Sequence, residues 1–142
     1  MATTQFSIGR DCQLVVIGPA DRVDISFVTG FESSQMTQPI RIDRLDGIQM
    51  ATELPKGWEG SFEVERGSSA IDDFIASAEQ AYRTNGSLPY GMIYQYVSEP
   101  DGSLSTYQYD GVVFRLENSG TWRGDAAVKQ KLLFFASSRA RL

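Results

Sequence analysis

The chain has 142 residues, of which 42% are hydrophobic and 22% charged, and its formal net charge is −5. This length predicts one domain over residues 1–142, large enough to bury a core without disulfides. The single cysteine, Cys12, excludes a disulfide within the chain, and the absence of histidine excludes the commonest general base and metal ligand. We find no apolar run of about 18 residues, so the sequence predicts neither a membrane span nor a signal peptide.

Charge is distributed unevenly along the chain. Residues 1–110 contain 16 acids and 7 bases, a net charge of −9, whereas residues 111–142 contain 2 acids and 6 bases, a net charge of +4. The acidic body argues against binding nucleic acid through its phosphates, because such binding requires clustered Lys and Arg. The basic C-terminal segment is suited to an acidic surface, including one on another copy of the chain.

The first half of the chain predicts four strands. Residues 12–18 and 22–31 have strand composition with turn residues between them, and residues 34–47 continue as a third strand. Residues 46–57 follow neither hydrophobic period and predict a loop or extended arm. In the fourth strand, residues 58–65, apolar and acidic side chains alternate, so one face is buried and the other carries three glutamates.

The second half predicts a helix followed by three strands. The helix carries Asp72 and Asp73 in its first turn, ends at Asn85 and Gly86, and has one apolar stripe, which predicts that it lies flat on the sheet. Residues 90–118 predict a hairpin, with a bulge where the alternation slips at Asp110-Gly111. Residues 126–138 predict the last strand.

Together these elements predict a mainly β fold: an antiparallel β-sandwich or barrel of about seven strands with one flanking α-helix. Several strands are long for so small a domain. They imply exposed edges that a soluble monomer would have to protect.

The sequence carries no constellation typical of an enzyme. It has no nucleotide-binding or hydrolase motif, no cysteine pair for zinc and no histidine partner for Cys12. Glu63 and Glu65 have the spacing of a carboxylate pair, but they lie on an exposed strand face without an evident pocket. We therefore expect no enzymatic activity, no cofactor and no metal.

The order of the segments resembles that of phage tail tube proteins. "VTGF" at 28–31, a loop, "LPKGWEGSFEVERG" at 54–67 and "SSAIDDFIASAEQAY" at 68–82 resemble the strand, loop, strand and helix of that family. The stretch "YQYDGVVFRLENSGTWRGDAAVKQKLLFFASSRARL" at 107–142 resembles its closing half. The resemblance covers roughly residues 20–142 and rests on the order of these segments and on the chain length.

The resemblance implies hexameric rings that stack into a hollow tail tube, through which phage DNA passes during genome ejection without specific binding. The family shares its fold with the tube protein of type VI secretion, and the chain length favours the contractile-tail type. It implies no cofactor, partners in the sheath, baseplate and tape-measure proteins, and a place in the virion tail after assembly in the host cytoplasm.

Three alternatives stay open. Two are structural: a type VI-like secretion tube, and an initiator or terminator subunit that occurs in a single ring. The third, from another class, is a small-molecule-binding β-barrel, which predicts a stable monomer with a closed interior pocket.

Three sets of residues are candidates for roles in a tube. The resemblance implies that the polar face of the second and third strands lines the lumen, where negative charge repels DNA phosphates, and that residues 46–57 contact the adjacent ring. The glutamates of residues 58–65 face either the lumen or the outside opposite the lysines of the last strand, and the shared spacing of two favours the second position. The lumen candidates are Asp24, Ser26, Glu32 and Asp43; the ring-stacking candidates are Ile48, Met50 and Leu54; the intersubunit or outer-face charge candidates are Glu59, Glu63, Glu65, Lys129, Lys131, Arg139 and Arg141.

Overall fold

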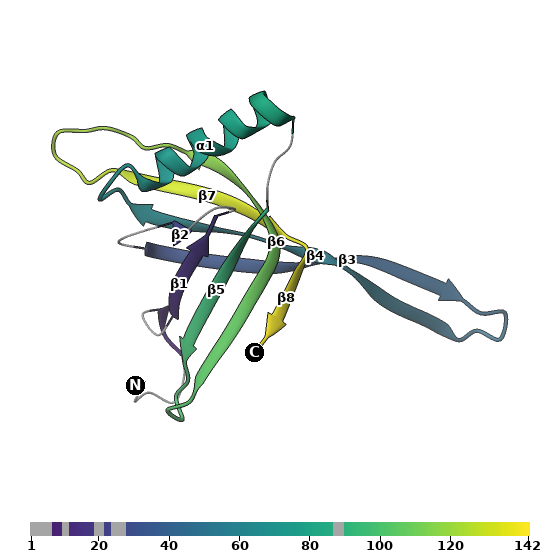
Figure 1. Ribbon diagram of the computed structural model, residues 1–142. Coiled ribbons are helices and arrows are strands. Elements are labelled where there is room, and N and C mark those ends of the chain that lie inside the picture. The colour runs from purple at the N-terminus through teal and green to yellow at the C-terminus, as the bar shows by residue number, and fades with distance from the viewer. Residues whose placement is uncertain (1–6, 10–11, 19–21, 24–27, 87–89) are drawn as a thin grey trace.

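The computed structural model describes residues 7–9, 12–18, 22–23, 28–86 and 90–142. Within these residues the chain forms eight strands and one helix, which confirms the predicted mainly β fold with a flanking helix (Figure 1). The strands are β1 (Cys12–Ile17), β2 (Arg22–Val23), β3 (Val28–Asp43), β4 (Gln49–Glu65), β5 (Gly91–Ser98), β6 (Leu104–Asn118), β7 (Lys129–Ala136) and β8 (Ser138–Arg141), and the helix is α1 (Ala70–Asn85).

The strands form one antiparallel sheet in the order β2-β1-β5-β6-β7-β4-β3, and this sheet does not close into a barrel. The long strand β6 belongs to both halves of the sheet. Its first part pairs with β5 and β8, and its second part pairs with β7. The sheet therefore folds over at β6, and its two halves enclose the core.

The fold-over coincides with the bulge that the sequence predicts at Asp110-Gly111. Ile93 pairs with Tyr109, but Gly91 pairs with Val112, so β6 contains one residue more than β5 across this interval. Gly111 has φ of 61°, in the left-handed region that favours glycine. The bulge is confirmed, and it marks the point where β6 passes from one half of the sheet to the other.

Tyr109 lies at the centre of the core and is fully buried. Its ring makes edge contacts with Phe31, Trp58 and Phe134, with centroids 6.1, 6.3 and 5.7 Å away. Its hydroxyl donates a hydrogen bond to Gln95 Oε1 (3.1 Å) and lies 3.0 Å from the hydroxyl of a β3 serine, Ser33. The hydroxyl of this β6 side chain thus links a residue of its neighbour β5 to a residue of β3, the edge strand of the other half of the sheet.

The helix α1 covers the core with only its first half. Ile71 is buried, and the ring of Phe74 packs edge-on against Phe114 of β6 at 5.3 Å. The helix ends, as predicted, at Gly86, whose N–H donates to Tyr82 O. Tyr82 is 55% exposed, because the second half of α1 extends beyond the sheet (Figure 1). The prediction that α1 lies flat on the sheet is therefore correct for its N-terminal half only.

Two predicted strand boundaries are wrong. The second and third predicted strands are not separate over their described parts, because β3 runs without interruption through the polar stretch at 32–38, which its pairing with β4 keeps extended. The predicted last strand breaks at Ser137, whose N–H donates to Asp110 O (2.9 Å). Up to Ala136, β7 pairs with β4, and beyond Ser137 the chain continues as β8, which pairs with the first part of β6.

The prediction of a loop at residues 46–57 is also wrong for most of that stretch. Only Arg44–Ile48 form the turn, and residues 49–57 are regular strand paired with β3 up to Asp43 and Gln49. Backbone pairing, which hydrophobic periodicity does not report, holds them extended. Residues 37–55 form a two-stranded arm that projects from the body (Figure 1), so the predicted arm exists but is a hairpin.

We predict that Tyr109→Phe lowers the free energy of unfolding of the subunit by about 1–2 kcal/mol, because it leaves the partly buried Gln95 Oε1 without its donor. The measurement is urea denaturation of the unassembled chain. Tyr90→Phe is the matched control, since Tyr90 is 67% exposed, and it should change stability by less than about 0.5 kcal/mol. Equal effects of the two substitutions would show that the hydroxyl of Tyr109 does not stabilise the core.

Candidate functional site

The face of β3, β4 and β7 that points away from the core is rich in charge. Glu63 pairs with Lys131 and Glu65 pairs with Lys129, the register that the spacing indicated. Lys131 forms an ion pair with Glu117 of β6 at 3.6 Å, and both side chains are more than one-third exposed. Pairs this exposed contribute about 0–1 kcal/mol each. The acidic strand β4 and the basic strand β7 therefore partly neutralise each other within one subunit.

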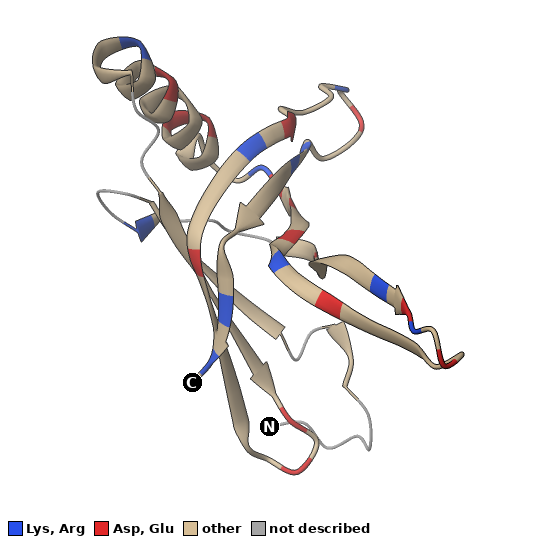
Figure 2. Ribbon diagram, turned by 90° about the vertical axis from the view of Figure 1, so that its right-hand side faces the viewer, with Lys and Arg blue, Asp and Glu red and all other residues tan. Residues whose placement is uncertain are grey.

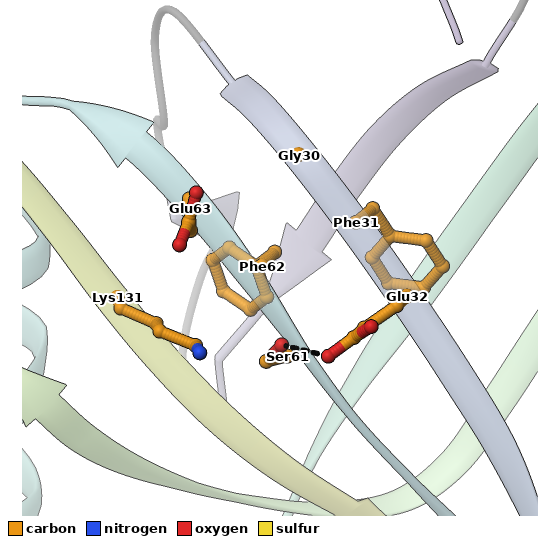
Figure 3. Close-up of a pocket in the computed structure, with 7 residues that line it drawn as sticks. All are labelled: Gly30, Phe31, Glu32, Ser61, Phe62, Glu63 and Lys131. Carbon is orange, nitrogen blue, oxygen red and sulfur yellow. Dashed lines mark hydrogen bonds between the residues drawn. The ribbon is translucent and has the colours of Figure 1, made fainter.

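A shallow groove of about 290 Å³ lies on this charged face (Figure 3). Glu32 accepts a hydrogen bond from the buried Ser61 (3.1 Å), Glu63 stands beside them, and the side chain of Lys131 extends from β7 towards Ser61. The groove is thus lined by two carboxylates and one ammonium group. The charged side chains of this face are mostly exposed to solvent.

The structure places the described lumen candidates on opposite faces. Glu32 pairs with Ser61, so it shares the face of Glu59 and Glu63. Asp43 is odd-numbered in β3 and lies on the other face, near the tip of the arm. Two further candidates, Asp24 and Ser26, lie outside the described residues.

This register contradicts one combination that the sequence analysis favoured. It assigned Glu32 to the lumen and the glutamates of β4 to the outer surface, yet cross-strand partners share a face of the sheet. Glu32, Glu59, Glu63 and Glu65 therefore face the same way.

The arm has one apolar face and one polar face. Ile42 pairs with Met50, Ile40 with Thr52 and Gln38 with Leu54, which places the large apolar side chains on one side. The opposite side carries Arg41, Asp43 and Glu53. Every residue from 37 to 56 is exposed. The exposed fractions of the apolar face are 37% for Ile40, 55% for Ile42, 52% for Met50 and 41% for Leu54.

The ring-stacking candidates all lie on the arm. Met50 and Leu54 belong to its apolar face, and Ile48, 51% exposed, lies in the turn at its tip. Ile40 and Ile42 belong to the same apolar face and were not among the candidates predicted from the sequence. The alternation with Arg41 and Asp43 was visible, but their partners in β4 were not.

A β-bulge in β4 marks the root of the arm. Met36 pairs with Gly57 but Thr37 pairs with Pro55, so Lys56 is an extra residue in β4. Gly57 has φ of 117°, and a Cβ there would lie 2.7 Å from Ala136 O. Glycine is therefore required on both conformational and steric grounds.

The two C-terminal arginines differ in their surroundings. The guanidinium carbon of Arg139 lies 3.8 Å from the ring centre of Tyr107 and 4.7 Å from that of Trp58, a cation–π arrangement. Arg141 donates a hydrogen bond to Ser105 Oγ at 3.3 Å. Arg139 of β8 thus packs on rings of β4 and β6, so of the two roles expected for it, intersubunit or outer-face charge, a fully exposed outer-face position does not apply.

The described residues hold no grouping of three or more His, Cys, Asp or Glu side chains that could bind a metal ion. In the same part of the chain, no helix is long and apolar enough to cross a membrane.

No protein-family model matches the chain, and no curated protein matches its sequence. Solved structures do match its fold. A chain of the sheath–tube complex of an extracellular contractile injection system (PVC) in the extended state is 14% identical, with a TM-score of 0.62 over 92% of this chain and 88% of that chain. The sheath/tube terminator of a PVC system is also 14% identical, with a TM-score of 0.63 over 92% and 93% of the two chains.

A third match is the tube-terminating cap of the anti-feeding prophage, 11% identical with a TM-score of 0.62 over 98% of this chain and 93% of that chain. At these identities the likeness concerns the fold. The chain has the fold of contractile-tail tube-type proteins.

Proposed function

We propose that the protein is a structural subunit of a phage-like contractile tail, and that its hexameric rings stack into a hollow tube that conducts the genome inside a sheath. The observation that carries this proposal is the open sheet with its projecting arm. An isolated two-stranded hairpin with an exposed apolar face is marginally stable in water. Association of copies covers such a face and pairs the free strand edges.

The likeness to a sheath–tube complex supports the tube role and a sheath as partner. The proposed tube subunit binds no cofactor and catalyses no reaction. The alternative of a small-molecule-binding barrel is not favoured, because the space between the two halves of the sheet is filled by the core side chains around Tyr109.

A second candidate function is that of a terminator or cap subunit, which forms one ring at the end of a tube. It is favoured by one observation: the matches to a terminator and to a tube-terminating cap have TM-scores of 0.63 and 0.62, as high as the 0.62 of the sheath–tube match. The two functions differ in whether the purified chain polymerises beyond one ring.

We further propose that the shared face of Glu32, Glu59, Glu63 and Glu65 lines the lumen. Four carboxylates on one sheet face repel phosphates, so that a duplex slides past without binding. Lys129 and Lys131 lie opposite two of them and reduce the negative charge of the face without making it basic. Of the two positions open for the β4 glutamates, this one is consistent with the register of Glu32.

We expect the purified chain to form rings with six subunits per layer, each subunit burying more than the ~1,600 Å² of a standard interface. Size-exclusion chromatography with negative-stain electron microscopy measures this directly. Long tubes support the tube role, and single rings support the terminator role. A monodisperse monomer at high concentration, with no rings in the micrographs, would contradict both.

For the arm, we predict that replacing Ile48, Met50 and Leu54 with serine abolishes long tubes and leaves folded subunits. Burying a side chain of this size contributes about 1.5–3 kcal/mol, so each contact between rings loses several kcal/mol. The matched control replaces Gln49, Ala51 and Glu53 with serine. These residues lie in the same strand but on the polar face of the arm, so this variant should still form tubes. Full-length tubes from the first variant would show that the arm does not join the rings.

For the lumen, we predict that Glu32→Lys with Glu63→Lys leaves tubes able to form but slows DNA ejection from particles that carry them, because cations in the wall attract phosphates. Asp43→Lys is the control, since Asp43 lies on the opposite face of β3. Ejection is followed by fluorescence of released DNA. A normal ejection rate in the double variant would place this face outside the channel.

A further inference from the structure

A second groove, of about 490 Å³, opens where the arm leaves the body, and the assembly surfaces described above do not include it. Two of its lining side chains are cations and four carry neutral hydrogen-bonding groups, and the described residues that line it include no acid. The residues that matter for its chemistry are Gln35, Lys56, Trp58, Ser137, Ser138 and Arg139.

Arg139 is held in this groove in a fixed position. Its guanidinium lies over the rings of Tyr107 and Trp58. Its Nε is buried and, among the described residues, has no hydrogen-bond partner. A buried cationic donor without an acceptor is unfavourable. A carboxylate is the group whose geometry best fits a guanidinium, because the two form parallel, charge-assisted hydrogen bonds.

Lys56 adds a second positive charge at the rim. It is the extra residue of the arm-root bulge and is exposed, so its ammonium group is free to approach an incoming anion. The bulge and Gly57 fix the backbone beneath it. The groove therefore combines one fixed and one adaptable cation, which suits an acidic side chain on a projecting loop.

The chain carries such a loop at the turn between β5 and β6 (Figure 2). Asp101 accepts hydrogen bonds from the N–H (2.9 Å) and hydroxyl (2.6 Å) of Ser103, which lower its pKa and keep the carboxylate ionised. The turn is closed by the hydrogen bond from Gly102 N–H to Glu99 O (3.0 Å). None of the four ion pairs between described residues includes Glu99 or Asp101.

This acidic turn does not reach the groove of its own subunit. Arg139 pairs with Tyr109, six residues along β6 from Ser103, a separation of about 20 Å at roughly 3.3 Å per residue. An acidic turn that enters the groove therefore belongs to a different copy of the chain.

We propose that the arm-root groove is a receptor site for the acidic turn at Glu99–Asp101 of a neighbouring copy. The inference rests on the proposed function, since it assumes that copies assemble. It assigns to the groove a contact that is polar and directional, distinct from the apolar contact of the arm. Because charge complementarity chiefly sets association rate and register, its loss should slow assembly.

The experiment compares three variants by light scattering and electron microscopy: Lys56→Glu, Glu99→Lys, and both substitutions together, with Asp101 kept as the carboxylate available to Arg139. Each of the first two should slow assembly by about tenfold or more, and the combined variant should recover to within about threefold of wild type. Arg139 is left unchanged because it packs on core rings. The control is the charge exchange Arg123→Glu with Asp125→Lys, in the exposed loop before β7, which should assemble at the wild-type rate.

The outcomes separate this inference from the proposed function. Wild-type assembly with unchanged rates in the first two variants would overturn the groove as an interface and leave the tube role intact. Slow assembly that the combined variant does not recover would overturn the acidic turn as its occupant. Absence of assembly in the wild type would contradict the proposed function and, with it, this inference. Thermal denaturation of each variant verifies that the subunits are folded.

Discussion

The fold depends on the backbone of β6 at Asp110 and Gly111. Gly111 adopts a left-handed conformation, and a Cβ there would lie 2.5 Å from Ser137 Oγ. Ser137 is the residue at which the chain leaves β7 for β8, and its N–H donates to Asp110 O. The two passages between the halves of the sheet are thus joined at one point. Without this bend Tyr109 would not reach β3 and β5 together, and the halves would not enclose a core.

The uneven charge of the sequence has a structural counterpart. The basic C-terminal segment supplies β7, which lies beside the acidic strand β4, so that Glu63 meets Lys131 and Glu65 meets Lys129 within one subunit. Part of the positive charge therefore lies opposite acids of the same subunit, and the guanidinium of Arg139 packs over the aromatic ring of Tyr107. The glutamates at 32 and 59 remain on the face without a lysine opposite them.

Residues with strong local signals were predicted correctly from the sequence. Gly86 ends the helix, Gly111 marks the bulge, and the alternation of β7 buries Leu132 and Phe134. The strands of the arm were not predicted from the sequence, because both faces of the arm are exposed and backbone pairing alone holds residues 49–57 extended. The shared face of Glu32 and Glu63 also depends on register between strands, which no single segment encodes.

The arm reverses the polarity of the strand from which it extends. In the body, Phe31 faces the core and Glu32 faces away from it, whereas in the arm the even-numbered Ile40 and Ile42 are apolar and Asp43 is polar. In Figure 1 the two strands cross at the root of the arm, where the ribbon twists. By residue alternation, Ile40 and Ile42 continue the side of β3 that carries Glu32, so this side changes from acidic in the body to apolar in the arm. One uninterrupted strand can thus present carboxylates to one surrounding and apolar side chains to another, as a subunit with both a lumen and a neighbouring ring requires.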